Sequence, residues 1–130
     1  MNIPLPDKKF VQPKIIKPID AQFLVNLALD IWRLEIRMAK LKTKLDENMV
    51  KPMIYQVNSC LRNLLNMGIQ IKDDYTGKIY KTSMNLDVVS YESVDMTGTE
   101  AIVKETIEPA ILFNDTLLHK AKVIIATPRS

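Results

Sequence analysis

Few residues of this 130-residue chain have the types and spacing that catalysis requires. Asp73 and Asp74 are the most suggestive pair, because two carboxylates can bind a divalent cation or share acid–base work. They are adjacent in a turn-forming stretch, however, and adjacent side chains in a turn usually point apart. His119 is the only histidine and Cys60 the only cysteine, so the familiar metal and nucleophile patterns cannot be assembled.

Other parts of catalytic motifs are missing as well. The three glycines, Gly68, Gly77 and Gly98, are too few and too widely spaced for a phosphate-binding loop. Glu105 and Glu108 lie near an expected bend, where they are predicted to face solvent or a partner protein. The sequence therefore predicts no enzyme, no catalytic or metal site and no cofactor, and indicates a binding module.

Composition places the chain among ordinary soluble proteins, with 47% hydrophobic and 25% charged residues and a net charge of +3. The basic residues at 37–44 are predicted to form a solvated helix face, and phosphate binding is the less favoured alternative, so nucleic acid is not an expected partner. Cys60 is predicted to be a buried thiol. No signal core and no membrane-spanning run are found, which indicates a cytoplasmic protein without membrane contact.

The first helix is predicted to begin after Asp20, a good N-cap residue. Its apolar residues recur in alternating steps of three and four, which is the heptad pattern of a helix that pairs with another helix. A second apolar row from Val25 to Ala39 widens this face and favours a bundle, with the core helix of a monomer as the alternative. The residues predicted to form a homodimer interface are Leu24, Leu27, Ile31, Leu34, Met38, Leu41 and Leu45.

A second amphipathic helix is predicted after the polar stretch at 46–48. Pro52 is tolerated in a first helical turn, and Gly68 suits the left-handed residue that ends a helix. Two such helices would form a hairpin, and two hairpins a four-helix bundle. A single kinked helix is the alternative.

Beyond Gly68 the pattern changes to short alternating segments with turn residues between them. Pro109 marks a bend, and Asn114-Asp115 is a plausible hairpin turn. The predicted strands lie at 69–72, 78–80, 84–92, 101–108, 111–113, 117–118 and 121–126. The expected fold class is α+β: an extended Pro-rich tail (1–18), a helical dimerisation segment (19–68) forming a coiled coil or four-helix bundle, and a small all-β domain of about six short strands (69–127).

Two segments resemble the GrpE family, the nucleotide exchange factors of DnaK-type chaperones. In LRNLLNMGIQI, the family's end-of-helix positions are held by Leu61, Leu65, Gly68, Ile69 and Ile71. The segment IVKETIEPAILFNDTLLHKAKVIIA is similar, without a gap, to the family's closing block, in which a strand, a hairpin and a final alternating strand follow one another. The matching positions there are Ile102, Val103, the Asn114-Asp115 turn, Ala121, Val123, Ile125 and Ala126.

The likeness covers about residues 57 to 126 and has departures. Ala110-Ile111 replaces the family's usual Gly-Tyr, and His119-Lys120 stands where an arginine is usual. The family's Phe-Asp-Pro and His motif has no counterpart, and neither has most of its long N-terminal coiled coil. The sequence therefore resembles a divergent, shortened relative.

The resemblance implies a homodimeric co-chaperone. Its β domain would bind the nucleotide-binding domain of a DnaK-type chaperone, or of a related actin-fold ATPase, and promote ADP release. A dimeric adaptor that binds another protein through the β domain is the alternative. For Ile107 and Leu112 a purely structural role is equally well supported. The partner-binding residues that the family pattern implies are Ile107, Glu108, Pro109, Leu112, Asn114, Asp115 and Thr116.

Overall fold

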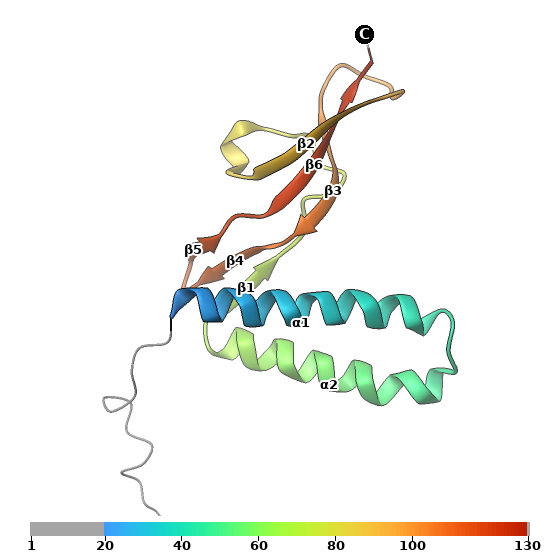
Figure 1. The fold of residues 1–130 in the computed structure, drawn as a ribbon, viewed down its shortest axis with the longest axis vertical. Helices are drawn as coiled ribbons and strands as arrows, with labels where there is room; N and C mark the ends of the chain where they lie inside the picture. The colour runs from blue at the N-terminus through green and yellow to red at the C-terminus, as the bar shows by residue number, and fades with distance from the viewer. Residues whose placement is uncertain (1–19, 130) are drawn as a thin grey trace, which may run out of the picture.

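The computed structural model describes residues 20–129 and confirms the α+β order, with two helices followed by six strands (Figure 1). The helices α1 (Ala21–Lys42) and α2 (Glu47–Asn66) form a hairpin. The predicted tail at 1–18 lies outside the described residues. The strands are β1 (Ile69–Lys72), β2 (Asp87–Val94), β3 (Ile102–Glu108), β4 (Ala110–Phe113), β5 (Thr116–His119) and β6 (Lys122–Pro128).

Asp20 begins α1 as predicted, because its side chain accepts a hydrogen bond from the backbone N–H of Gln22 at 3.1 Å. At the other end, Lys40 and Lys42 lie in the last turn, where positive charge suits the negative end of the helix dipole. The turn between the helices occupies residues 43–46. The chain therefore forms two separate helices and not one kinked helix.

The second helix begins earlier than the sequence suggests. Asp46 is its N-cap and accepts a hydrogen bond from the backbone N–H of Asn48 at 3.0 Å, so Pro52 lies inside the helix and not in its first turn. Pro52 has no N–H to donate to the carbonyl of Asn48, four residues earlier. Asn48 is exposed, so water can satisfy that carbonyl. Gly68 follows the helix with a φ of +94°, as predicted.

The strands form two sheets. Sheet A has the order β1-β4-β5 and is antiparallel, whereas sheet B has the order β2-β6-β3, with β2 parallel and β3 antiparallel to β6. The chain passes from sheet A to sheet B through residues 73–86, returns to sheet A at Pro109 and passes to sheet B again through residues 120–121. The turn at Asn114 and Asp115 is confirmed, with φ of 48° and 67° as a tight two-residue hairpin requires.

Two predicted strands are wrong in part. Residues 78–80 contribute only an isolated bridge between Ile79 and Ile102. Met84 belongs to a short 3₁₀ helix, η3 (Thr82–Met84), and β2 begins later, at Asp87. Asn85 ends η3 in the left-handed region with a φ of 57°, which interrupts the extended chain that the alternation of apolar residues suggests.

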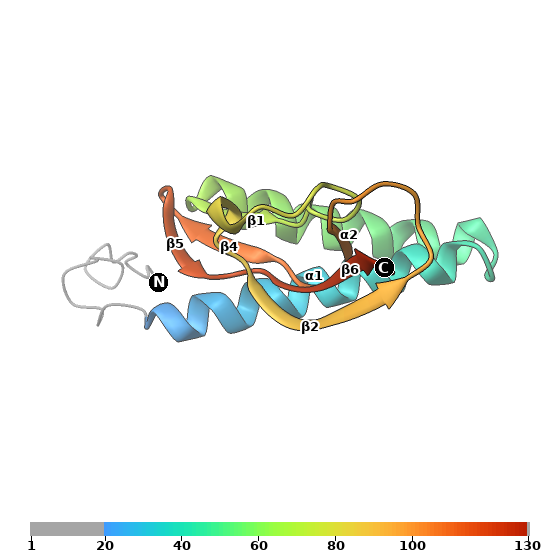
Figure 2. The ribbon, with the colours of Figure 1, turned by 90° about the horizontal axis from the view of Figure 1, so that it is seen from above.

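Two separate cores lie on the strand side of the hairpin. Seen from above, α1 and α2 lie side by side beneath the strands (Figure 2). The first core joins both helices to sheet A, and the second lies within the β region. The first consists of Leu24, Val25, Ala28, Leu29, Leu64, Ile69 and Ile111, and the second of Tyr75, Val103, Ala110, Ala121, Val123 and Ile125.

Candidate functional site

The residues predicted to bind a partner follow one another from the end of β3 to the start of β5, but they do not form one exposed surface. Ile107 is 39% exposed, and Asn114, Asp115 and Thr116 are exposed. Leu112 is half-buried against the core of sheet B. Pro109 is fully buried, so its side chain is not accessible to a partner in this conformation.

Asn114 faces the hairpin. Its backbone N–H donates a hydrogen bond to the carbonyl of Gly68 at 2.9 Å. A Cβ placed on Gly68 would collide with the Oδ1 atom of Asn114, so a larger residue would displace that side chain, and the positive φ of Gly68 also favours glycine. The β4–β5 turn is therefore seated on the end of α2, and Asn114 has a structural role there.

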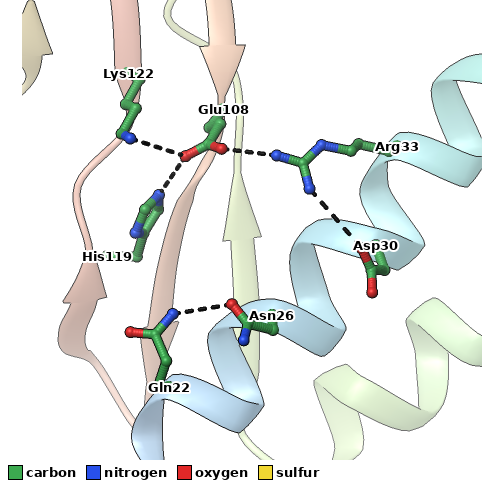
Figure 3. Close-up of polar contacts among 7 residues, drawn as sticks. All are labelled: Gln22, Asn26, Asp30, Arg33, Glu108, His119 and Lys122. Carbon is green, nitrogen blue, oxygen red and sulfur yellow. Dashed lines mark hydrogen bonds and ion pairs between the residues drawn. The ribbon is translucent and has the colours of Figure 1, made fainter.

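Glu108 is the centre of an ionic cluster that we call the Glu108 joint, formed with Arg33, His119 and Lys122 (Figure 3). Its Oε2 atom accepts a hydrogen bond from Arg33 Nη2 at 2.7 Å, and its Oε1 atom accepts one from His119 Nε2 at 2.8 Å. Lys122 Nζ lies 3.8 Å from the same Oε1 atom. The Glu108 side chain is 15% exposed, so it is engaged inside the protein.

The charge state of Glu108 follows from these neighbours. Burial raises the pKa of its carboxyl group, but the hydrogen bond from His119 and the charges of Lys122, His119 and Arg33 outweigh that effect. The net result is a pKa below the ordinary value for glutamate. Glu108 is therefore a carboxylate at neutral pH and is not suited to act as a general acid.

Asp73 and Asp74 point to different partners, as predicted for adjacent turn residues. Asp73 Oδ2 accepts a hydrogen bond from the indole Nε1 of Trp32 at 2.8 Å, whereas Asp74 Oδ2 pairs with Lys78 Nζ at 3.1 Å. Burial and the nearby charge of Asp73 raise the pKa of Glu35 on α1. Within residues 20–129, no group of three histidine, cysteine or acidic residues is placed to hold a metal ion.

The seven residues predicted to form the dimer interface divide into two sets. Leu24 and Met38 are buried and Ile31 is half-buried, in contacts within one protomer. Leu24 and Met38 are therefore not accessible to a second copy, and Ile31 is partly covered by the core that α1 shares with sheet A. The exposed members of the set are Leu27, Leu34, Leu41 and Leu45.

A matching row lies on α2. Met53, Cys60 and Met67 are seven residues apart and hence share one side of that helix. Met53 and Met67 are exposed, and Cys60 is half-exposed, so the prediction that Cys60 is a buried thiol is wrong. The reason is its place on the outward side of α2. We call this row, together with Leu27, Leu34 and Leu41 of α1, the outer face of the hairpin.

Both rows point away from the strands. An α-helix turns by about 100° per residue. On α1, Met38 marks the side that faces α2, because it packs with Val50 and Val57. Val25 and Ala28, which belong to the core shared with sheet A, fall on one side of Met38. Leu27, Leu34 and Leu41 fall on the other side.

The same holds for α2. Leu61 and Leu65 line a groove against β1, whereas Met53 and Met67 lie on the opposite side of the contact with α1. The two-helix layer thus has a strand-covered side and an apolar side. That apolar side has no cover among the described residues of the chain.

Sequence reasoning missed the partners of Glu108. Arg33 lies 75 residues away and His119 lies 11 residues away, on elements with no local pattern in common. The only signal was a glutamate at the end of a strand, just before Pro109. A charged residue at such a crossing between sheets is a reasonable place to look for an ion pair, but its partners depend on the tertiary fold.

No protein-family model matches the sequence, and no curated protein matches it. No helix between residues 20 and 129 is long and apolar enough to cross a membrane.

Proposed function

We propose that this protein is a GrpE-like co-chaperone, which binds the nucleotide-binding domain of a DnaK-type chaperone or a related actin-fold ATPase and promotes ADP release. One observation carries the proposal: a helical hairpin ends at Gly68 and continues into two small sheets. The segment that resembles the closing block of the GrpE family supplies β3 to β6 of these sheets. The order of elements and the sequence resemblance therefore support the same function.

In this proposal the chemistry belongs to the partner ATPase. A protein that binds the open form of the ATPase more tightly than the closed form shifts the population to the open form and weakens nucleotide binding. Ile107, Asn114, Asp115 and Thr116 are the predicted contact residues that a partner can reach. Glu108 acts indirectly, because it fixes the bend, and the backbone hydrogen bond of Asn114 fixes the turn.

The outer face of the hairpin supports a homodimer. A second copy related by a two-fold axis would cover the same face on both protomers and complete a four-helix bundle. An apolar face of this kind is uncommon on a monomer. In this arrangement the interface contains Leu27, Leu34 and Leu41 together with Met53 and Met67, and it excludes the buried Leu24 and Met38.

A dimeric adaptor is the second candidate. The observation that favours it is the internal use of several predicted contact residues. Pro109 is buried, Glu108 is bound to Arg33 and His119, and Asn114 is seated on Gly68. Because these side chains are engaged within the protein, the remaining exposed surface would suit a partner other than the ATPase of the family.

The test is the release rate of a fluorescent ADP analogue from a DnaK-type chaperone of the same organism, with and without this protein. We expect faster release, a reduced effect with Ile107→Asp, and full retention with Val89→Asp. Val89 is a matched control, because it is an exposed aliphatic residue on β2. If no actin-fold ATPase of the organism releases nucleotide faster, the exchange proposal fails and the adaptor remains.

A further inference from the structure

The two sheets are attached to the helices in different ways. Sheet A shares a core with α1 and α2 through Ile69 and Ile111. The core of sheet B is built from residues of β3 and β6, from Tyr75 and Ala121 in the connecting loops, and from Ala110 of β4, and within residues 20–129 it includes no residue of either helix. Sheet B therefore has little apolar contact to hold it against the hairpin.

The Glu108 joint lies where sheet B meets the rest of the protein. Glu108 is the last residue of β3, His119 the last of β5, and Lys122 the first of β6, so the cluster includes residues from both short crossings between the sheets, β3 to β4 and β5 to β6. Arg33 reaches the same carboxylate from α1 (Figure 3). One side chain thus connects both short crossings to the helical hairpin. The third crossing, at residues 73–86, has its own contact with α1 through the hydrogen bond between Trp32 and Asp73.

We propose that the Glu108 joint is a conformational lock that fixes the orientation of sheet B relative to the hairpin. Breaking the joint lets sheet B, together with the residues that pack in its core, change its orientation relative to the hairpin. Two of the three crossings between the sheets are short, at Pro109 and at residues 120–121, and the third is the longer loop at residues 73–86. This inference stands apart from the proposed exchange activity and does not require it.

The charges around the joint decide when it is closed. Arg33 faces Glu108 from α1 and also lies 3.8 Å from Asp30, while His119 and Lys122 face it from β5 and β6. Burial raises the pKa of the Glu108 carboxyl group, but the hydrogen bond from His119 and the charges of Lys122 and Arg33 outweigh that effect and hold the pKa below its ordinary value, so the group is ionised at neutral pH. The lock is therefore closed at neutral pH and opens when the carboxylate is protonated in acid, or when Arg33 or Glu108 is replaced.

The experiment measures the distance between sheet B and the hairpin. Spin labels are placed on Lys51→Cys of α2 and Ser93→Cys of β2, two exposed positions, in a Cys60→Ser background. Labelled protein is mixed with an excess of unlabelled protein, so that pairs of labels on two copies do not contribute. Pulsed electron resonance then gives the distance distribution within one protomer.

We expect Glu108→Gln to broaden or shift this distribution at neutral pH, with the far-ultraviolet circular dichroism unchanged. Glu92→Gln is the matched control, because it removes the same charge from the pair between Glu92 and Lys104 within sheet B and should leave the distribution as in the parent protein. An unchanged distribution in a folded Glu108→Gln protein overturns the proposal.

A second variant covers the case in which Glu108→Gln fails to fold. Arg33 lies on the helix surface with 42% of its side chain exposed. Arg33→Gln removes the link from the joint to α1 and leaves the contacts of His119 and Lys122 with Glu108 in place. We expect a broader distribution here too. If Arg33→Gln leaves the distribution unchanged, the contact with α1 does not fix sheet B and the lock is rejected.

Discussion

Sheet A and sheet B have the same number of strands but different relations to the helices. Sheet A packs Ile69 and Ile111 into the hairpin, whereas sheet B packs in a second core that includes Ala110 of β4 but no helix residue, and it reaches α1 through the Arg33–Glu108 pair. The change from helix to strand at Gly68 is therefore not a division in packing. The hairpin and sheet A share one core, and the division lies between the two sheets, with Ala110 on the side of sheet B.

The test with the largest expected effect creates one cavity in each of these two cores by substitution. Ile111 and Ile125 are both fully buried, Ile111 in the core shared with the helices and Ile125 in that of sheet B. Replacement of either isoleucine by alanine should lower the free energy of unfolding by about 2–5 kcal/mol. Hydrogen exchange should show that Ile111→Ala lowers the protection of the backbone amides of α1 and α2. Ile125→Ala should lower mainly the protection of the amides of sheet B.

The two outcomes that matter are easy to separate. Equal loss of helix protection in both variants would mean that the two cores open together, and the division between the sheets would be rejected. Urea unfolding followed by circular dichroism gives the total loss of stability for each variant. That control shows whether the two substitutions lower the free energy of unfolding by similar amounts.

The second test concerns the side of the hairpin that neither sheet covers. Leu34 is 46% exposed on the outer face. Leu34→Asp should convert a dimer to a monomer, because a carboxylate buried without a partner at the helix contact costs at least about 2 kcal/mol. Light scattering measures the mass. Tyr55→Asp is the control, since Tyr55 is exposed on α2 away from the outer face and should leave the mass unchanged.

What the sequence could predict depends on how far apart the interacting residues are. Some features depend only on nearby residues, so a local sequence pattern is sufficient to predict them. Asp20 caps α1 through a hydrogen bond to a residue two positions away, and Gly68 and the Asn114-Asp115 turn depend on their own positive φ values. The heptad pattern found the apolar residues of α1 but could not tell which face inward. Met38 is buried and Leu34 is exposed because α2 and the strands occupy particular sides of the helix.

The contacts between the regions could not be predicted in this way. Trp32 bonds to Asp73 across 41 residues, and Arg33 bonds to Glu108 across 75. Neither pair has a spacing that any helix or strand pattern produces. These contacts follow from the placement of the sheets on the hairpin, and that placement is a property of the whole fold.

The third test removes the polar contact that joins α1 to the loop after β1. Asp73→Ala should destabilise the protein by about 1–2 kcal/mol, because the indole N–H of Trp32 loses its acceptor in a partly buried place. Asp73→Asn keeps an acceptor oxygen and should cost less. Trp32 is the only tryptophan, so its fluorescence reports this contact directly. Equal spectra for both variants would show that the hydrogen bond contributes little.

The smallest effect is expected from the pH dependence of the Glu108 joint. Because folding lowers the pKa of Glu108 below its ordinary value, the stability that the joint contributes is present above the pKa of the unfolded chain and is lost as the pH falls through the pKa of the folded protein. Urea unfolding between about pH 6 and about pH 3 should therefore show a smaller loss of stability for Glu108→Gln than for the parent protein. The other acidic groups are present in both proteins and cancel in the difference. An equal loss in both would mean that the contact between Glu108 and α1 adds no stability to the protein.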